Sequence, residues 1–134
     1  MIEVTGLGIS RIQLDEVESA LDEMLEGSKA SSVILINSDD GSLITAKGLT
    51  EALDTVSLAA LTAGAFASTQ EIARLVGEPE FTMLFHQGKR YHVHVHVAGR
   101  HCLVMTLFSD ETTLGMVRLC ARKACLRVQH ALER

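Results

Sequence analysis

Apolar residues recur at helical spacing in three segments of the chain. The first segment has the apolar residues Leu14, Val17, Leu21, Met24 and Leu25. Ser10 and Gln13 form the pattern of a capping box in front of it, and Gly27 marks its end. A second helix is expected from Thr55 to Val76. A third is expected from Thr113 onward, with the apolar residues Leu114, Val117, Ala121, Ala124, Val128 and Ala131.

Five shorter segments have the pattern of β-strands. Val33–Ile36 is an unbroken apolar run, typical of a strand that is covered on both faces. Turn residues connect it to a hairpin strand, Ser42–Lys47. Three more strands follow, separated by short turns: Phe81–His86, Tyr91–Val97 and His101–Phe108. The order α-β-β-α-β-β-β-α predicts one α+β domain over residues 1–134, with a five-stranded antiparallel sheet and helices on both faces.

The second helix lacks charge where a helix on a protein surface normally has it, since no charged residue occurs from Thr55 to Gln70. One side of this helix is apolar and is expected to pack on the sheet: Leu58, Leu61, Ala65, Ile72 and Val76. The opposite side has small residues, followed by polar ones: Ala59, Ala60, Ala63, Gly64, Ala67, Gln70, Glu71 and Arg74. We expect this opposite side to form a dimer and partner-binding surface, because small outward residues permit close helix contact.

Two other arrangements compete with self-association as an explanation of this helix. Helices that are apolar all round are usually buried, so it could lie between two layers of one domain. A membrane span needs about 20 predominantly apolar residues, whereas Thr62, Ser68 and Thr69 interrupt this run. We therefore expect no membrane insertion, and we favour pairing of the helix with a second copy of the chain.

Charge and cysteine content narrow the class of protein. The net charge of −5 over 134 residues argues against a nucleic-acid binder. The first helix has an acidic face and the last helix a basic one, so the two could lie side by side. Three cysteines without a CxxC motif indicate reduced thiols. No secretion signal is recognisable at the N-terminus, and we expect a cytoplasmic protein.

The sharpest chemical signal is the alternation of His92, His94 and His96 along one strand, which places three imidazoles on one face of the sheet. Such histidines could ligate zinc in a metal-dependent enzyme. A two-residue turn at Gly88-Lys89 would place the apolar residues Phe85, Met83 and Phe81 beside them. A turn at Gly99-Arg100 would place Leu107, Met105 and Leu103 on the other side. These surroundings favour packing over metal binding, so we expect neither a metal nor another cofactor.

Other catalytic patterns are absent from the sequence. It contains no GxxxxGK[ST] phosphate loop and no Gly-x-Ser-x-Gly elbow. Arg90 and Arg100 lie at turns and could be imagined as arginine fingers, although surface turn arginines are usually just solvated. The sequence therefore predicts a non-enzymatic protein. A sensor domain that binds a small ligand on the sheet face remains a further alternative.

The chain resembles the Roadblock family of small dimeric α+β domains. The resemblance covers roughly Leu14 to Leu132 and rests on the element order, the Asp40-Gly41 hairpin and the alanine-rich second helix. Two further segments look like bacterial members, at residues 85–90 and 113–118. Within the family the chain looks most like the MglB-type regulators of bacterial gliding-motility and polarity systems.

This resemblance implies a fold and a function. Roadblock domains form homodimers or heterodimers in which the sheets join and the second helices pack together. They bind Ras-like small GTPases, and MglB-type dimers stimulate GTP hydrolysis by their MglA partner without inserting an arginine. Such proteins commonly continue beyond the last helix, whereas the given sequence ends at Arg134. We therefore expect a dimeric regulator of a Ras-like GTPase, with a scaffold role as the variant of this function.

Overall fold

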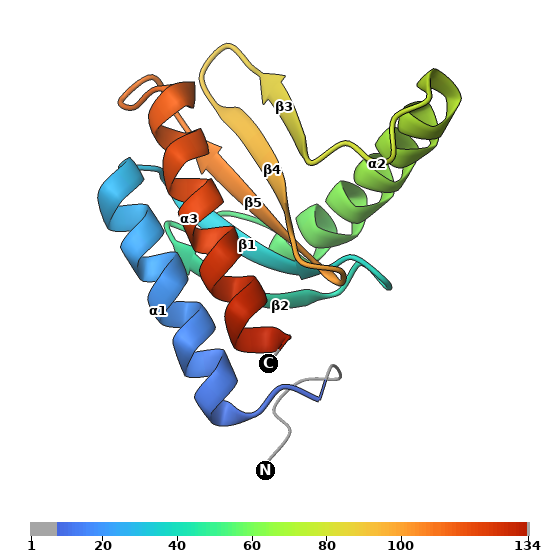
Figure 1. Ribbon diagram of the computed structural model, residues 1–134. Coiled ribbons are helices and arrows are strands. Elements are labelled where there is room, and N and C mark those ends of the chain that lie inside the picture. Colours follow the sequence, from blue (N-terminus) through green and yellow to red (C-terminus); the bar gives the residue numbers. More distant parts are fainter. Residues whose placement is uncertain (1–7, 134) are drawn as a thin grey trace.

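The computed structural model describes residues 8–133 and has the expected order of elements. Figure 1 shows the three helices and five strands: α1 (Arg11–Ser28), β1 (Ser32–Asn37), β2 (Leu43–Gly48), α2 (Thr55–Val76), β3 (Met83–Gln87), β4 (His92–Ala98), β5 (Cys102–Phe108) and α3 (Leu114–Leu132). All neighbouring strands are antiparallel, in the order β2-β1-β5-β4-β3. The predicted α+β fold is thus confirmed. No helix within residues 8–133 is long and apolar enough to cross a bilayer.

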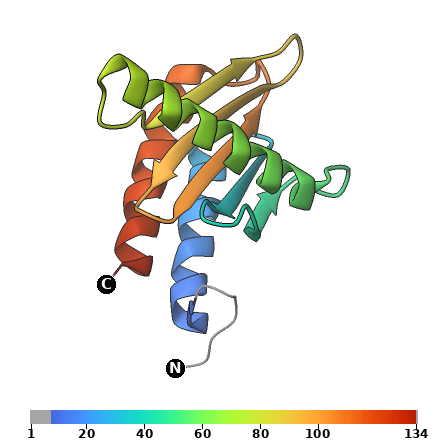
Figure 2. The same cartoon turned by 90° about the vertical axis from the view of Figure 1, so that its right-hand side faces the viewer.

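The sheet separates two hydrophobic clusters. Helices α1 and α3 lie on one face and α2 crosses the other, as the two views in Figures 1 and 2 show. Alternate residues of the buried strand β1 point to opposite faces. Val33 and Leu35 pack beneath α1 and α3, whereas Ile34 and Ile36 pack beneath α2. The apolar run therefore reflects a strand covered on both sides, as the sequence indicated.

Local signals fix the helix ends. The Ser10 hydroxyl accepts from the Gln13 amide, and the Gln13 side chain accepts from the Ser10 amide, which completes the predicted capping box. Thr113 caps α3 by accepting a hydrogen bond from the Met116 amide. Helix α2 ends at Gly77, whose φ of 83° is the left-handed conformation that glycine adopts without strain.

Opposite charges join α1 to its neighbours. Helices α1 and α3 pack side by side, and Arg127 lies 2.7 Å from Glu23 across their interface. On the other side of α1, Lys47 of β2 lies 3.5 Å from Glu18. Exposed ion pairs of this kind contribute only about 0–1 kcal/mol each. Their contribution to the free energy of folding is therefore small, and their main effect is to favour the observed orientation of α1 relative to α3 and β2.

Two predicted strand registers are wrong. The β3–β4 connection has four residues instead of two, so His94 pairs with Phe85 and His96 with Met83. The β4–β5 turn has three residues, with Gly99 at φ 76°. This one-residue slip moves every cross-strand neighbour to the other face. The histidines consequently pair with Phe108, Thr106 and Val104 instead of Leu107, Met105 and Leu103.

Candidate partner-binding surface

Helix α2 is held at both ends by its own polar groups. Asp54 accepts hydrogen bonds from the Ser57 amide at 3.0 Å and from the Ser57 hydroxyl at 2.7 Å. The hydrogen bonds from the Ser57 side chain and amide lower the pKa of Asp54. At the other end, the Glu78 amide donates to the Ala73 carbonyl oxygen at 2.9 Å. These contacts fix the helix although only part of it packs on the sheet.

The inner side of α2 is centred on Phe66. Phe66 is buried, and Ala59 and Ala73, seven residues before and after it, are buried on the same side of the helix. Phe66 and Ala59 pack with the sheet residues beneath them. The expectation that Ala59 faces outward is therefore wrong. Phe66 was the available signal, since it is the one aromatic residue of the helix.

The side that was expected to pack on the sheet is largely exposed. Leu61 is 72% exposed, Ile72 54% and Val76 64%, and Ala65 is exposed as well. Leu58 alone of the predicted stripe is partly buried against the core. The prediction failed because both sides of the helix are apolar, so a helical wheel could not decide which side the sheet covers.

Two of the small residues contact the chain's own β1–β2 turn. Gly41 lies in this turn with φ 75°, and an added Cβ there would lie 3.3 Å from Cα of Ala60 and 3.6 Å from Cβ of Ala63. Ala63 is half-buried, whereas Ala60 and Ala67 are exposed. A Cβ at Gly64 would meet no atom within 4 Å. The small residues at positions 60 and 63 therefore allow the β1–β2 turn of the same protomer to pack against α2. The glycine at position 64 faces open surface instead.

The polar residues of the predicted surface differ in their roles. Gln70 is half-buried, and its amide donates to the Phe81 carbonyl oxygen at 2.8 Å and accepts from the Phe81 amide at 3.0 Å. This pairing attaches the segment that enters β3 to the helix. Glu71 and Arg74 are exposed and form an ion pair at 2.8 Å. Among Gln70, Glu71 and Arg74, it is therefore Gln70 that connects α2 to another segment of the protomer.

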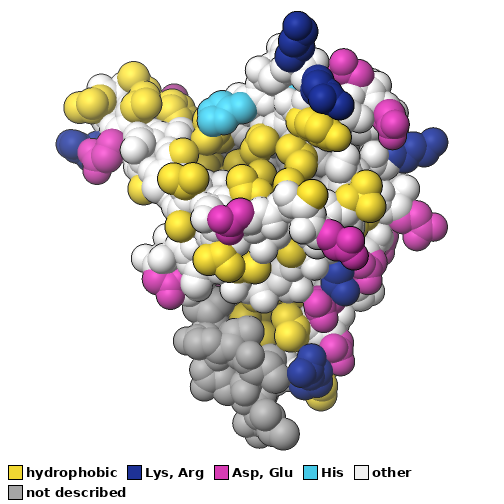
Figure 3. Space-filling model, turned by 180° about the vertical axis from the view of Figure 1, so that it is seen from behind, with side chains coloured by type: hydrophobic (Ala, Val, Ile, Leu, Met, Phe, Trp, Pro, Cys, Tyr) yellow, Lys and Arg dark blue, Asp and Glu magenta, His cyan; other side chains and the backbone are white. Residues whose placement is uncertain are grey.

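The outward side of α2 forms a continuous surface of apolar and small residues. We define the α2 surface as Ala60, Leu61, Gly64, Ala65, Ala67, Ser68, Ile72 and Leu75, all of which are exposed. Figure 3 shows hydrophobic side chains gathered over this helix and on the neighbouring sheet. A groove of about 230 Å³ lies between them, with Leu61 and Ala65 on one side and Leu84 and Val93 on the other. Contiguous exposed apolar area of this kind makes the α2 surface a candidate interaction site.

The sheet has a free edge near this surface. Strand β3 pairs only with β4 within residues 8–133, so the other edge of β3 offers unpaired backbone groups. Glu80 precedes the strand, and Lys89 and Arg90 follow it; all three are exposed. The edge is therefore acidic at its beginning and basic at its end.

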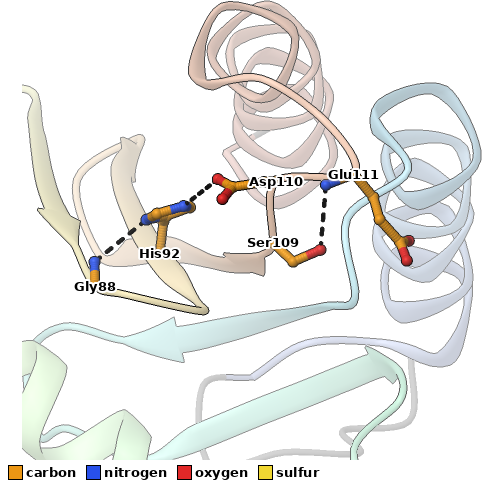
Figure 4. A network of polar contacts seen from close by, with 5 residues as sticks. All are labelled: Gly88, His92, Ser109, Asp110 and Glu111. Carbon is orange, nitrogen blue, oxygen red and sulfur yellow. Dashed lines mark hydrogen bonds and ion pairs between the residues drawn. The ribbon is translucent and has the colours of Figure 1, made fainter.

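The three alternating histidines are packed among other groups. Figure 4 shows His92 between the Gly88 amide, 3.2 Å from Nδ1, and Asp110, whose Oδ1 lies 2.8 Å from Nε2. Nδ1 of His96 contacts the Val97 carbonyl oxygen at 2.8 Å. Within residues 8–133 no three His, Cys, Asp or Glu side chains are arranged to hold a metal ion. Asp110 was missed because it follows the last strand in the loop before α3.

Burial sets the protonation of the groups near the core. His94 is fully buried, and neither of its ring nitrogens has a hydrogen-bond partner. Burial lowers its pKa to about 4, assisted by electrostatic repulsion from His96 and Arg118. Burial likewise raises the pKa of the Cys102 and Cys125 thiols to about 12. Neither cysteine therefore has the thiolate character that a nucleophile needs.

The chain is similar to known proteins both in sequence and in structure. Residues 16–108 match the sequence model of the Roadblock/LC7 domain. The structure of Myxococcus xanthus MglB is 33% identical and superposes with a TM-score of 0.84, over 88% of this chain and 95% of that one. The gliding protein MglB from Thermus thermophilus is 30% identical with a TM-score of 0.86, over 93% and 94%.

A third structure, described as MglB with a tetrameric arrangement, is 28% identical with a TM-score of 0.88, over 93% of each chain. A Roadblock/LC7 domain from Streptomyces avermitilis shares the fold at 15% identity and a TM-score of 0.78, over 87% of this chain and 97% of that one. No curated protein matches the chain in sequence.

Proposed function

The chain belongs to the Roadblock/LC7 family, and we propose that it is a non-enzymatic, cytoplasmic homodimer that regulates a Ras-like small GTPase of the MglA type. The observation that carries this proposal is the α2 surface, an apolar helix face that no other part of residues 8–133 covers. A regulator without a nucleotide loop or a reactive nucleophile must act by contact, and this surface offers the contact.

The free edge of β3 supports self-pairing. In an antiparallel pair of β3 strands with the two-fold axis at Phe85, Glu80 lies opposite Arg90 of the partner subunit. The symmetric contact repeats this pairing on the other side of the axis. Opposite charges at facing positions stabilise a strand pair, whereas a parallel arrangement would place like charges together. The charge pattern of the edge therefore favours a homodimer with a continuous ten-stranded sheet.

In such a dimer both α2 helices lie on the same face of the joined sheet, because each covers the same face of its own protomer. Leu61, Ile72 and Leu75 then supply the apolar area, and Glu71 and Arg74 lie at its border. Interfaces typically combine an apolar centre with a polar rim. A stable interface buries about 1,600 Å² in total, and we propose that the paired helices and the groove beside each together form the surface that the GTPase contacts.

We propose that the dimer accelerates GTP hydrolysis by reshaping the active site of the GTPase. Arg90 and Arg100 are exposed at the β3–β4 and β4–β5 turns. Each makes no hydrogen bond or ion pair with another residue in the range 8–133. Within residues 8–133 of the protomer no group holds either arginine in the fixed position that a finger requires, and in the proposed dimer Arg90 faces Glu80 of the partner subunit. Positioning of the GTPase's own groups is therefore the mechanism that we favour.

The proposal is tested by adding the protein to a purified MglA-type GTPase. Pull-down with the GTP-loaded and GDP-loaded forms measures nucleotide-dependent binding, and single-turnover hydrolysis measures acceleration. We expect binding that prefers the GTP-loaded form, together with faster hydrolysis. Binding without acceleration would show a scaffold instead of an activator. No binding in either state would contradict the proposed function.

A further inference from the structure

A second groove lies on the sheet face opposite the α2 surface. Helix α3 packs over β4 and β5, and β3 extends beyond it without a helix above it, as Figure 1 shows. The groove between α3 and β3 has a volume of about 460 Å³. Its lining includes the apolar residues Met83, Val97, Leu119 and Leu126 and the bases Arg118 and Arg122. We call it the α3–β3 groove.

The charge in this groove is uncompensated. Arg118 and Arg122 lie one helical turn apart on the same side of α3 and are exposed. Neither forms a hydrogen bond or ion pair with any residue in the range 8–133, and no acidic residue of that range lines the groove. Leu119 and Leu126 beside them are 52% and 62% exposed. The groove thus combines two free positive charges with exposed apolar side chains.

The other side of α3 differs in this respect. Lys123 and Arg127 line the groove between α3 and α1, where Arg127 is paired with Glu23. The outer side of α1 has further exposed acids, including Asp15, Asp22 and Glu26. A broad anionic partner such as a membrane would meet these acids together with the arginines. A narrow partner seated between α3 and β3 meets the arginines alone.

We propose that the α3–β3 groove binds an acidic amphipathic segment of another protein. Its apolar side chains pack against Leu119 and Leu126, and its carboxylates pair with Arg118 and Arg122, whose guanidinium groups suit bidentate carboxylate binding. The stretch from Arg118 to Leu126 spans about 12 Å at the helical rise of 1.5 Å per residue. It holds two helical turns or about four extended residues. Because it lies across the sheet from the α2 surface, it binds independently of a GTPase.

The test uses two fluorescein-labelled acidic peptides of twelve residues. One alternates leucine with glutamate, and the other places leucines at helical spacing. Counterparts with lysine in place of glutamate are the charge controls. Fluorescence anisotropy should show binding of at least one acidic peptide, weakening as salt is raised, and no binding of the lysine counterparts. The double variant Arg118→Glu/Arg122→Glu should bind at least tenfold more weakly.

Lys123→Glu is the matched control, since it reverses one charge on the same helix but outside the groove. It should change affinity by less than about threefold for a screened, exposed charge. Arg122→Ala provides a milder groove variant if the double variant melts at a lower temperature. Leu61→Glu, on the other sheet face, should bind the acidic peptides as the parent does.

Three results would overturn the inference. The first is no binding of either acidic peptide by the parent protein up to millimolar concentration. The second is an equal loss of binding in Lys123→Glu and the groove variants. The third is binding of vesicles that contain phosphatidylserine, or of single-stranded RNA, with the same dependence on Arg118 and Arg122, which would assign the groove to another class of partner.

Discussion

Nε2 of His92 lies 2.8 Å from Oδ1 of Asp110, and this contact joins strand β4 to the loop that precedes α3. A backbone amide can only donate, so the Gly88 amide requires an unprotonated Nδ1 on the same ring. The proton of the neutral imidazole therefore lies on Nε2 and is donated to Asp110. One side chain thus links two loops at the same end of the sheet.

Replacing His92 and replacing Asp110 should have unequal effects on stability. The His92 ring is buried against Phe108 and Phe85, with ring centroids 5.2 and 6.2 Å apart, so His92→Ala removes packing as well as hydrogen bonds. We expect it to lower the free energy of unfolding by about 2–4 kcal/mol. Asp110 is exposed, and Asp110→Ala should cost less than about 1 kcal/mol. Urea denaturation measures both; equal losses would show that the contact matters more than the packing.

The buried His94 should make stability depend on pH. Its pKa is lowered from 6.5 to about 4 in the folded protein, so the unfolded chain binds the proton first as pH falls. The contribution of His94 to stability should decrease from about pH 6.5 to pH 4 and then level off, by up to about 3 kcal/mol in total. His94→Leu removes the titrating group and two unpaired nitrogens, so it should flatten this part of the curve. An unchanged slope in the variant would assign the pH dependence to another group.

Gly64 offers a direct test of assembly through the α2 surface. A Cβ there meets no atom of the protomer, so Gly64→Ala should leave the fold intact and favour the helix by about 1 kcal/mol. Gly64→Arg should fold equally well but place a charge between paired helices. Light scattering at tens of micromolar should show a dimer for the parent and for Gly64→Ala, and a monomer for Gly64→Arg. A dimer in all three would exclude position 64 from the interface.

The turn arginines should be dispensable for GTPase activation. Loss of a true arginine finger costs about 10³–10⁵ in rate. Arg90→Ala and Arg100→Ala should each retain most of the acceleration in single-turnover hydrolysis, although Arg90→Ala also removes an ion pair from the proposed β3 contact and should weaken the dimer slightly. A collapse of a thousandfold or more, with binding retained, would mean that this protein does supply a finger.

The sequence predicted those features that depend on neighbouring residues. The capping box of Ser10 and Gln13, the end of α2 at Val76 and the buried strand β1 all follow from local patterns, and the structure confirms them. The hairpin registers were wrong because turn length depends on backbone conformation, such as the left-handed Gly99 in a three-residue turn. The His92–Asp110 contact depends on the observed pairing of His92 with Phe108, so the predicted register could not have revealed this contact.

The orientation of α2 was the main error, and it changes the candidate surface. Large apolar residues were assigned to the core and small ones to the partner, whereas Leu61 and Ile72 face outward and Ala59 faces the sheet. A helix that is apolar on all sides does not reveal its inner side by periodicity. The spacing of Ala59, Phe66 and Ala73 would have indicated the inner side. The prediction that this helix has an unusual, uncharged outward surface nevertheless agrees with the exposed apolar residues of α2.

The proposed function requires that the GTPase binds at the α2 surface of the dimer. The most direct measurement is titration calorimetry of a GTP-analogue-loaded MglA-type GTPase into three proteins: the parent, Leu61→Glu and Lys123→Glu. Leu61 is exposed on α2, and Lys123 is exposed on the opposite face of the sheet, so both variants should fold. We predict that Leu61→Glu weakens binding at least tenfold, because it places a charge in an apolar interface, while Lys123→Glu binds as the parent does. Equal affinity of the parent and Leu61→Glu would contradict GTPase binding at the α2 surface.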